Sequence, residues 1–393
     1  MIWFWIGFIL FVLAMLAIDL GVFHLQAHAV SVKEALIWSA VWITISLLFN
    51  VFIYFAYSHH WLGIGRAPDG SVMIDRVDGL PLNGHNAALK FFTGYVIEKS
   101  LSVDNIFVIA LIFAFFKIPN KYQHRVLFWG IIGALIMRGI FIGVGAALIA
   151  KFHWILYVFG AFLVYTGIKM LRSDEDPDPQ NSRLVRWARR WFPITHELHG
   201  QHFVIPRSDL HAGEAVEPPT SGDAASADAG AASSEPVPAK SPAAMAAMPS
   251  GSSTYVLTPL ALALIVVEGT DLIFAVDSIP AIFAITGDSF LVFTSNIFAV
   301  LGLRALYFAL AGILDKFHYL KTSLAFVLAL VGVKMLTADF LKQNEFLKRN
   351  LSFVTLGLIA LILAAGVIAS LLTTRRTATE PPQTPDPGPD AAR

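Results

Sequence analysis

Long apolar stretches recur along the whole chain and constrain its fold more than any other feature. A helix needs about 20 apolar residues to cross a bilayer core of roughly 30 Å. Stretches of this kind lie near residues 2–23, 35–57, 87–116, 125–150, 153–171, 256–286, 290–312, 319–338 and 351–372. Only 14% of the residues are charged, against about 25% in an ordinary soluble domain. The sequence therefore predicts an all-α polytopic membrane bundle of about nine spans.

Charge and residue usage exclude several classes of function. Formal net charge is zero, which gives no reason to expect a nucleic-acid partner. The chain has no cysteine, so oxygen and imidazole are its strong metal-ligand types. We find no nucleophile elbow, phosphate loop or zinc helix in a suitable place. We therefore expect neither an enzyme nor a bound cofactor.

Basic residues in the short loops predict the orientation, because Lys and Arg are enriched on the cytoplasmic side. Lys117, Lys121 and Arg125 follow the third stretch, and Arg375 and Arg376 follow the ninth. The loop between the sixth and seventh stretches has neither Lys nor Arg. We expect the N-terminus outside and the C-terminus in the cytoplasm of a bacterial inner (plasma) membrane protein.

The remaining segments divide the chain further. Residues 1–60 form a predicted N-terminal two-helix segment, and 351–372 form an extra C-terminal span. Residues 172–255 form a predicted cytoplasmic insert, which is rich in Ala, Ser, Gly and Pro from about residue 212. That composition buries too little apolar surface to offset the entropy of ordering, so we expect disorder from there and also in the tail, 373–393.

An internal repeat relates two parts of the chain. The segment EKSLSVDNIFVI, which begins at Glu98, aligns without gaps to DLIFAVDSIPAI, which begins at Asp271. The alignment continues downstream, where Arg138 matches Arg304 and GIKML at 167–171 matches GVKML at 332–336. Each unit, 87–171 and 256–338, has three helices. Because three is odd and the insert returns to the side it left, the two units are predicted to form an inverted repeat, an arrangement typical of transporters.

Nine of the charged side chains within the apolar stretches are candidates for a common role. Each costs at least about 2.5 kcal/mol at the bilayer centre unless it has a partner or meets water. These residues are Asp19, Glu98, Lys99, Asp104, Arg138, Glu268, Asp271, Asp277 and Arg304. Six acids face three bases, so ion pairing alone leaves an acidic excess. An oxygen-coordinated cation or retained protons would supply the missing charge.

The spacing of these residues suggests separate roles. We expect metal ligation by Glu98, Asp104, Glu268, Asp271, Asp277 and Asp19. Asn105, Asn50, Asn296 and Ser278 either ligate the metal or bridge helices. Arg138, Arg304 and Lys99 are expected to be structural charge partners. Pro280 cannot donate to the carbonyl of Val276, which predicts a kink in the sixth span close to Asp277.

Several long segments resemble the TerC family, specifically its Alx-like branch. They are EKSLSVDNIFVIALIFAFFKIP, FWGIIGALIMRGIFI, TPLALALIVVEGTDLIFAVDSIPAIFAIT, FTSNIFAVLGLRALYF and LVGVKML. The resemblance covers roughly residues 1–340. It implies membership of the lysine-exporter-like transporter group, inner-membrane location and Mn²⁺ export linked to metal, alkaline or tellurite stress.

Two hypotheses remain open from the sequence. The first is a Mn²⁺ exporter that works by alternating access at a carboxylate-lined site near the midplane, with the metal ion and the lipid bilayer as its partners. Oxygen ligands without sulfur suit manganese, magnesium or calcium. The second is a membrane scaffold that docks at the Sec translocon or a resistance complex, with its acids in structural ion pairs. Contacts between copies of the chain are compatible with either.

Overall fold

The computed structural model describes residues 2–24, 31–67, 69–152, 154–172, 193–195, 198–207, 216–217, 255–310, 319–337, 340 and 345–377. Two compact units divide the chain. The larger contains residues 1–110, 128–176 and 270–393, and the smaller contains 111–127 and 177–269. Each is described by itself.

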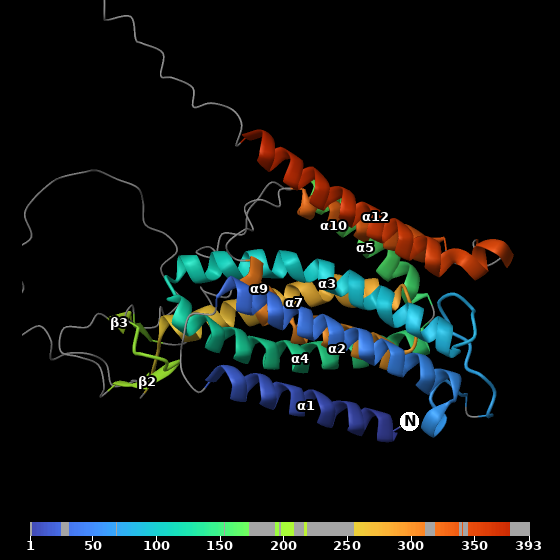
Figure 1. Cartoon of the computed structure of the whole chain (residues 1–393), viewed down its shortest axis with the longest axis horizontal. Coiled ribbons are helices and arrows are strands. Elements are labelled where there is room, and N and C mark those ends of the chain that lie inside the picture. The colour runs from blue at the N-terminus through green and yellow to red at the C-terminus, as the bar shows by residue number, and fades with distance from the viewer. Residues whose placement is uncertain are drawn as a thin grey trace, which may run out of the picture. The chain divides into compact units, whose positions relative to one another are not determined.

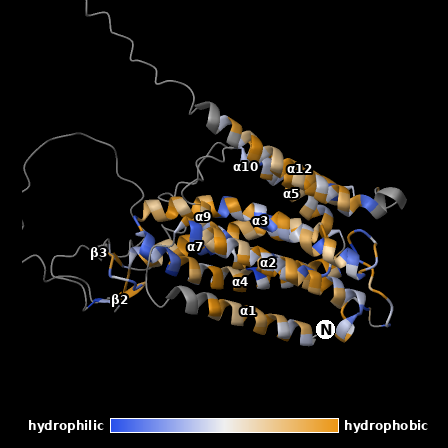
Figure 2. Cartoon of the chain, in the orientation of Figure 1, coloured by the Kyte–Doolittle hydropathy of each residue, from blue (hydrophilic) through white to orange (hydrophobic). Residues whose placement is uncertain are grey.

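Helices dominate the described residues, as the apolar stretches predict. In chain order they are α1 (Ile2–His24), α2 (Val32–Ser58), the 3₁₀ turn η1 (Trp61–Gly63), α3 (Gly84–Phe115), α4 (Asn120–Lys151), α5 (Ile155–Arg172), α7 (Pro259–Phe283), α8 (Ser289–Leu301), α9 (Leu303–Leu310), α10 (Leu320–Leu336) and α12 (Glu345–Thr377). Figure 2 shows hydrophobic residues along these helices. The all-α membrane class is confirmed.

Six of the described helical segments are long and apolar enough to cross a bilayer. They are Val32–Ser58, Asn120–Lys151, Ile155–Arg172, Pro259–Phe283, Ser289–Leu310 and Asn350–Ser370. Helix α3 has 32 residues but carries Lys90, Glu98, Lys99 and Asp104. The count of nine spans and the inverted repeat stay predictions.

Local sequence explains where two helices begin. The Ser31 hydroxyl accepts a hydrogen bond from the Glu34 amide at the start of α2, at 3.2 Å. The Asp288 carboxylate accepts from the amides of Phe290 (2.9 Å) and Leu291 (3.1 Å) at the start of α8. Both side chains satisfy amides that have no partner in the first helical turn.

Two helix features bear on the sequence expectation. Helix α7 runs from Pro259 to Phe283 with Pro280 inside it, and the kink predicted close to Asp277 stays a prediction. The stretch 290–312, predicted as one span, corresponds to the apolar segment Ser289–Leu310. Gly302 divides this segment into α8 and α9.

Apolar packing joins the helices of the larger unit. One core combines Phe8 of α1, Ile53 of α2, Phe91 of α3 and Phe298 of α8. A second contains residues of α3, α4, α5, α7, α8, α10 and α12. Helix α10 packs against α5 and α12, and α2 packs against α8 and α9 (Figure 1).

The smaller unit contains a four-stranded sheet that the sequence did not predict. The strands β1 (Ile194–Thr195), β2 (Val204–Pro206), β3 (Val216–Glu217) and β4 (Tyr255–Leu257) lie in the order β2-β4-β1-β3. Strand β3 falls within the stretch predicted to be disordered from about residue 212. Residues 212–215 and 218–254 lie outside the described residues.

The last helix extends further than the sequence predicts. Helix α12 runs to Thr377, past the end of the expected span at 372. The rest of the predicted disordered tail, 378–393, lies outside the described residues.

Candidate functional site

Arg138 on α4 binds carboxylates from two other helices. Its Nη1 pairs with Oε1 of Glu98 on α3. Its Nη2 and Nε donate to the two carboxylate oxygens of Asp271 on α7, at 2.8 and 3.1 Å. This two-bond geometry suits a planar guanidinium. Charges predicted separately in the sequence therefore meet across α3, α4 and α7.

Neutral groups complete the surroundings of Arg138. Its Nη1 lies 3.3 Å from Oδ1 of Asn296 on α8 and 3.5 Å from Oγ of Ser278 on α7. The Arg138 side chain is 0% exposed and that of Glu98 is 1% exposed. Removing one member of a buried ion pair costs about 3–5 kcal/mol, because an uncompensated charge stays behind. Arg138 therefore joins α4 to α3 and α7 through buried ion pairs.

A small polar cavity adjoins this ion pair. Its volume is about 50 Å³. Its lining residues are Glu98, Leu101, Asp104, Asn105, Arg138, Met170, Phe274, Asp277, Ser278 and Leu328. We call it the acidic cavity. A cavity needs only about 10–15 Å³ to hold one water molecule, so water or a dehydrated ion fits inside.

Two oxygens at the acidic cavity accept no hydrogen bond from the residues that the structure describes. They are Oε2 of Glu98 and Oδ1 of Asn105, and both are buried. Leaving a buried acceptor unsatisfied costs about 1–3 kcal/mol, more for a charged group. A cation or water in the cavity would satisfy both oxygens.

The carboxylates of Asp104 and Asp277 face different neighbours at this cavity. Oδ1 of Asp277 lies 3.3 Å from the Thr166 hydroxyl of α5, which donates to it. Lys321 of α10 lies within electrostatic reach of Asp104, and Lys169 of α5 within reach of Asp277. Each of the two acids therefore has a lysine of another helix nearby.

The other predicted residues lie elsewhere. Asp19 is in α1, and its side chain lies outside the described part of the chain. Glu268 belongs to the smaller unit and Asp271 to the larger. Oδ1 of Asn50 is buried on α2 and has no hydrogen-bond partner among the described residues. Arg304 is buried on α9. Among the residues that the structure describes, no three carboxylate or imidazole groups converge closely enough to hold a metal ion.

Lys99 lies at the break between α8 and α9. Its Nζ donates to the carbonyl oxygen of Ala299 at 3.2 Å, and α8 ends two residues later. The last carbonyls of a helix lack partners and carry partial negative charge, so an ammonium there is stabilising. Lys99 thus binds a broken helix end, whereas the sequence predicted a charge partner.

A second buried ionic cluster escaped the sequence analysis. Nζ of Lys90 on α3 lies 2.7 Å from Oδ2 of Asp75 and 2.9 Å from Oδ1 of Asp78. Asp75 also accepts from the Thr286 hydroxyl (2.5 Å) and the Gly287 amide (3.0 Å). The signal was present, since Lys90 lies in the stretch 87–116, where a charge needs a partner.

The pKa values of Asp75 and of the nearby Asp288 shift in opposite directions. Burial raises the pKa of Asp75, but Lys90, Thr286 and the Val77 amide outweigh burial and leave that pKa below its ordinary value. Burial raises the pKa of Asp288, and the charge of Asp75 raises it further. The segment 75–78 is therefore fixed to α3 and to the α7–α8 connection by an ionised Asp75.

These features define an integral membrane protein with charged groups buried between its helices. Residues 83–378 match the family described as "Integral membrane protein TerC family", and the chain belongs to this family. It is 42% identical to "Uncharacterized membrane protein STKORF319" of Myxococcus xanthus over 97% of this chain and 96% of the relative.

Other relatives are similar over most of their length. "Putative membrane-bound redox modulator Alx" of Escherichia coli (strain K12) is 40% identical over 86% of each chain. An uncharacterized membrane protein of Rickettsia bellii is 36% identical over 95% of this chain and 99% of the relative. No solved structure matches the chain. The resemblance to the TerC family and its Alx-named members is thus confirmed.

Proposed function

We propose that this protein transports a divalent metal cation across the bacterial inner membrane, with Mn²⁺ as its principal substrate and export as its direction. The observation that carries the proposal is the acidic cavity. Three carboxylates and an amide line it, and within the described part of the chain the buried oxygens Oε2 of Glu98 and Oδ1 of Asn105 have no hydrogen-bond partner. Carboxylate and carbonyl oxygens suit Mn²⁺.

Ligation in this proposal falls mainly on Asp104 and Asp277. Arg138 already neutralises much of Glu98 and Asp271, so those acids are less available to an ion. Asp104 and Asp277 come from different helices, and an ion between them would join α3 to α7. Movement of one helix against the other would then change the ligand set, as alternating access requires.

The name given to several relatives also bears on the proposal. A redox role in this chain would have to work without thiols, because the chain has no cysteine. Movement of a redox-active metal ion is one route to such a role. It requires no reactive side chain of the protein itself.

Metal flux into proteoliposomes tests the proposal. We expect the full chain to move Mn²⁺ along an imposed gradient, recorded with an enclosed metal-sensitive dye. Asp104→Asn and Asp277→Asn should each reduce the initial rate by at least about tenfold, since loss of a metal-site group commonly weakens binding that much. Asp69→Asn is the matched control, because Asp69 is an exposed acid that binds only within its own turn, to Ser71.

Assembly has to be measured beside flux. Each variant should elute and unfold like the wild type. Normal transport by both Asn variants would show that the ligand assignment is wrong. A well-folded wild type that moves no metal under any gradient, yet still protects cells, would favour the scaffold.

A further inference from the structure

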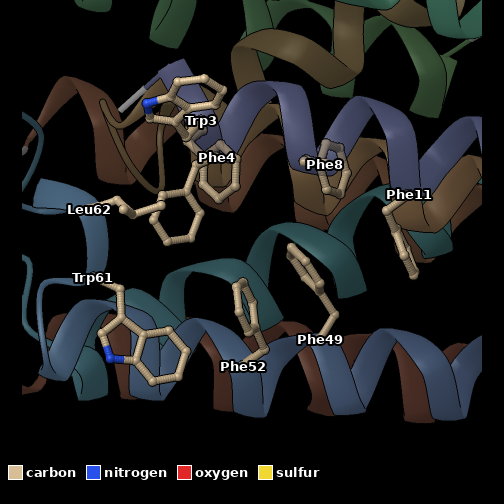
Figure 3. A pocket seen from close by; sticks show the side chains of 10 residues that line it. Trp3, Phe4, Phe8, Phe11, Phe49, Phe52, Trp61 and Leu62 are labelled. Carbon is tan, nitrogen blue, oxygen red and sulfur yellow. The ribbon is translucent and has the colours of Figure 1, made fainter.

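An aromatic groove lies between α1 and α2, away from the acidic cavity. Its volume is about 750 Å³, within the usual range of about 300–1,000 Å³ for small-molecule sites. Its lining residues are Trp3, Phe4, Gly7, Phe8, Phe11, Phe49, Phe52, Trp61, Leu62 and Phe290. Figure 3 shows rings of α1 facing rings of α2 across the open space.

The floor of this aromatic groove is rigidly built. Phe8 packs edge to face on Phe290 of α8, with ring centroids 5.9 Å apart. Phe49 lies 4.6 Å from Phe298 and 5.5 Å from Phe8, again between ring centroids. Gly7 keeps the space open, since a Cβ built on it would meet nothing within 4 Å. The hollow therefore results from a missing side chain between packed rings.

The mouth of the groove carries backbone strain. His60 and Leu62 both have φ of 51° without being glycine. A left-handed conformation costs such a residue roughly 1–2 kcal/mol. The strained turn leaves the Leu62 side chain 64% exposed at the mouth. An apolar occupant of the groove would cover this exposed side chain.

One end of the groove is suited to the membrane–water interface. Trp3 lies near the start of α1, and Trp61 follows the end of α2. Tryptophan is enriched at the level of lipid headgroups. The exposed His59 stacks on Trp61, with ring centroids 6.1 Å apart. The groove thus has aromatic and imidazole groups at one end and only hydrocarbon further in, at Phe8 and Phe11.

We propose that the aromatic groove holds one acyl chain of a bilayer phospholipid, with the headgroup beside His59 and Trp61. The helices that form it, α1 and α2, are apolar segments of a membrane protein, so phospholipid is the ligand present at the highest concentration. The mainly apolar lining matches an acyl chain, and the indoles of Trp3 and Trp61 match its glycerol end. The proposal does not depend on metal transport.

Filling the groove tests the proposal. The full chain is purified in detergent, supplied with dioleoyl phosphatidylethanolamine and examined by native mass spectrometry. Wild type should retain one phospholipid, and Gly7→Phe should lose it, because the new ring occupies the open space. The matched control is Gly143→Phe on α4, where a Cβ also meets nothing within 4 Å, and it should retain the lipid.

A second variant separates lipid loss from misfolding. Leu62→Gly removes the exposed side chain and relieves the positive φ. It should retain less phospholipid than wild type but unfold at the same or a higher temperature in lipid-free detergent. Equal lipid retention by Gly7→Phe and Gly143→Phe would overturn the proposal. So would an isoprenoid quinone as the retained molecule, or a second copy of the chain that leaves when Gly7 is replaced.

Discussion

Asp75 shows how much a single buried carboxylate contributes when donors surround it. Lys90, Thr286, Gly287 and Val77 all donate to its two oxygens. Each of the two carboxylate oxygens of Asp75 therefore accepts from two donors. Together these bonds fix the segment before α3 to the connection between α7 and α8.

Stability should depend on pH through Asp75. Its pKa is lowered on folding from 3.8, so its contribution is fully present above that pH and is lost as pH falls below it. At neutral pH, Asp75→Asn should reduce the free energy of unfolding by about 3 kcal/mol, because buried Lys90 loses one of its two charged partners and keeps only Asp78. Thermal unfolding of both proteins, at neutral pH and below pH 3.8, measures the difference.

The pH profile also has a control. Asp69→Asn removes an exposed carboxylate and should change the unfolding temperature little at either pH. The difference between wild type and Asp75→Asn should shrink in acid. A difference that grows in acid would contradict the proposed ionisation of Asp75.

At the scale of elements, glycines set how closely α5 and α10 approach. A Cβ on Gly332 of α10 would lie 2.7 Å from the carbonyl oxygen of Gly160 on α5. A Cβ on Gly167 of α5 would lie 2.7 Å from the carbonyl oxygen of Ala325 on α10. Small residues permit such backbone contact between membrane helices. Gly167 and Gly332 open the matched sequences GIKML and GVKML.

Substitution of Gly332 should separate the two helices. Gly332→Leu places a side chain against backbone that cannot move aside, so we expect a loss of about 1–3 kcal/mol or more from overpacking. Gly357→Leu on α12 is the control, because nothing lies within 4 Å of its Cβ position. Unfolding temperatures in one detergent compare the two. If they fall equally, the close α5–α10 contact does not matter for stability.

The sequence predicts the extent of a helix well where the length and hydropathy of an apolar stretch determine it. The extents of α2, α4 and α5 follow from apolar stretches alone. The division at Gly302 was not predicted, because hydropathy shows 290–312 as one stretch, and no hydropathy pattern reveals that Lys99, distant in sequence, binds the end of α8. The strands β1–β4 were missed because two or three residues carry no measurable alternation.

For the candidate site, intramembrane charge was a sufficient signal for Glu98, Arg138, Asp104 and Asp277, which all line one cavity. The assignment of pairs was not predictable. Arg138 was expected to lock helices, but nothing in the spacing indicated that one guanidinium would bind Glu98 and Asp271 together. Such pairing depends on how α3, α4 and α7 pack in three dimensions.

At the scale of the whole molecule, orientation remains a prediction from the basic loops. A reporter fused at residue 230 should be active only as a cytoplasmic protein, because the insert follows the loop that carries Arg172 and precedes α7. A second fusion at residue 70, between α2 and α3, should report the opposite side. Cytoplasmic signals from both fusions would refute the orientation.

The charges around the acidic cavity also determine how the membrane potential acts on transport. Glu98, Asp104, Asp271 and Asp277 against Arg138, Lys169 and Lys321 leave one formal negative charge, and a divalent ion changes it to one positive charge. Moving one charge through the full potential costs roughly 2.3 kcal/mol per 100 mV. Under the proposed function, the membrane potential therefore acts in opposite directions on the empty and the loaded protein. Both halves of the cycle become electrically sensitive, and protons carried back on the acids would change the voltage dependence of the return step.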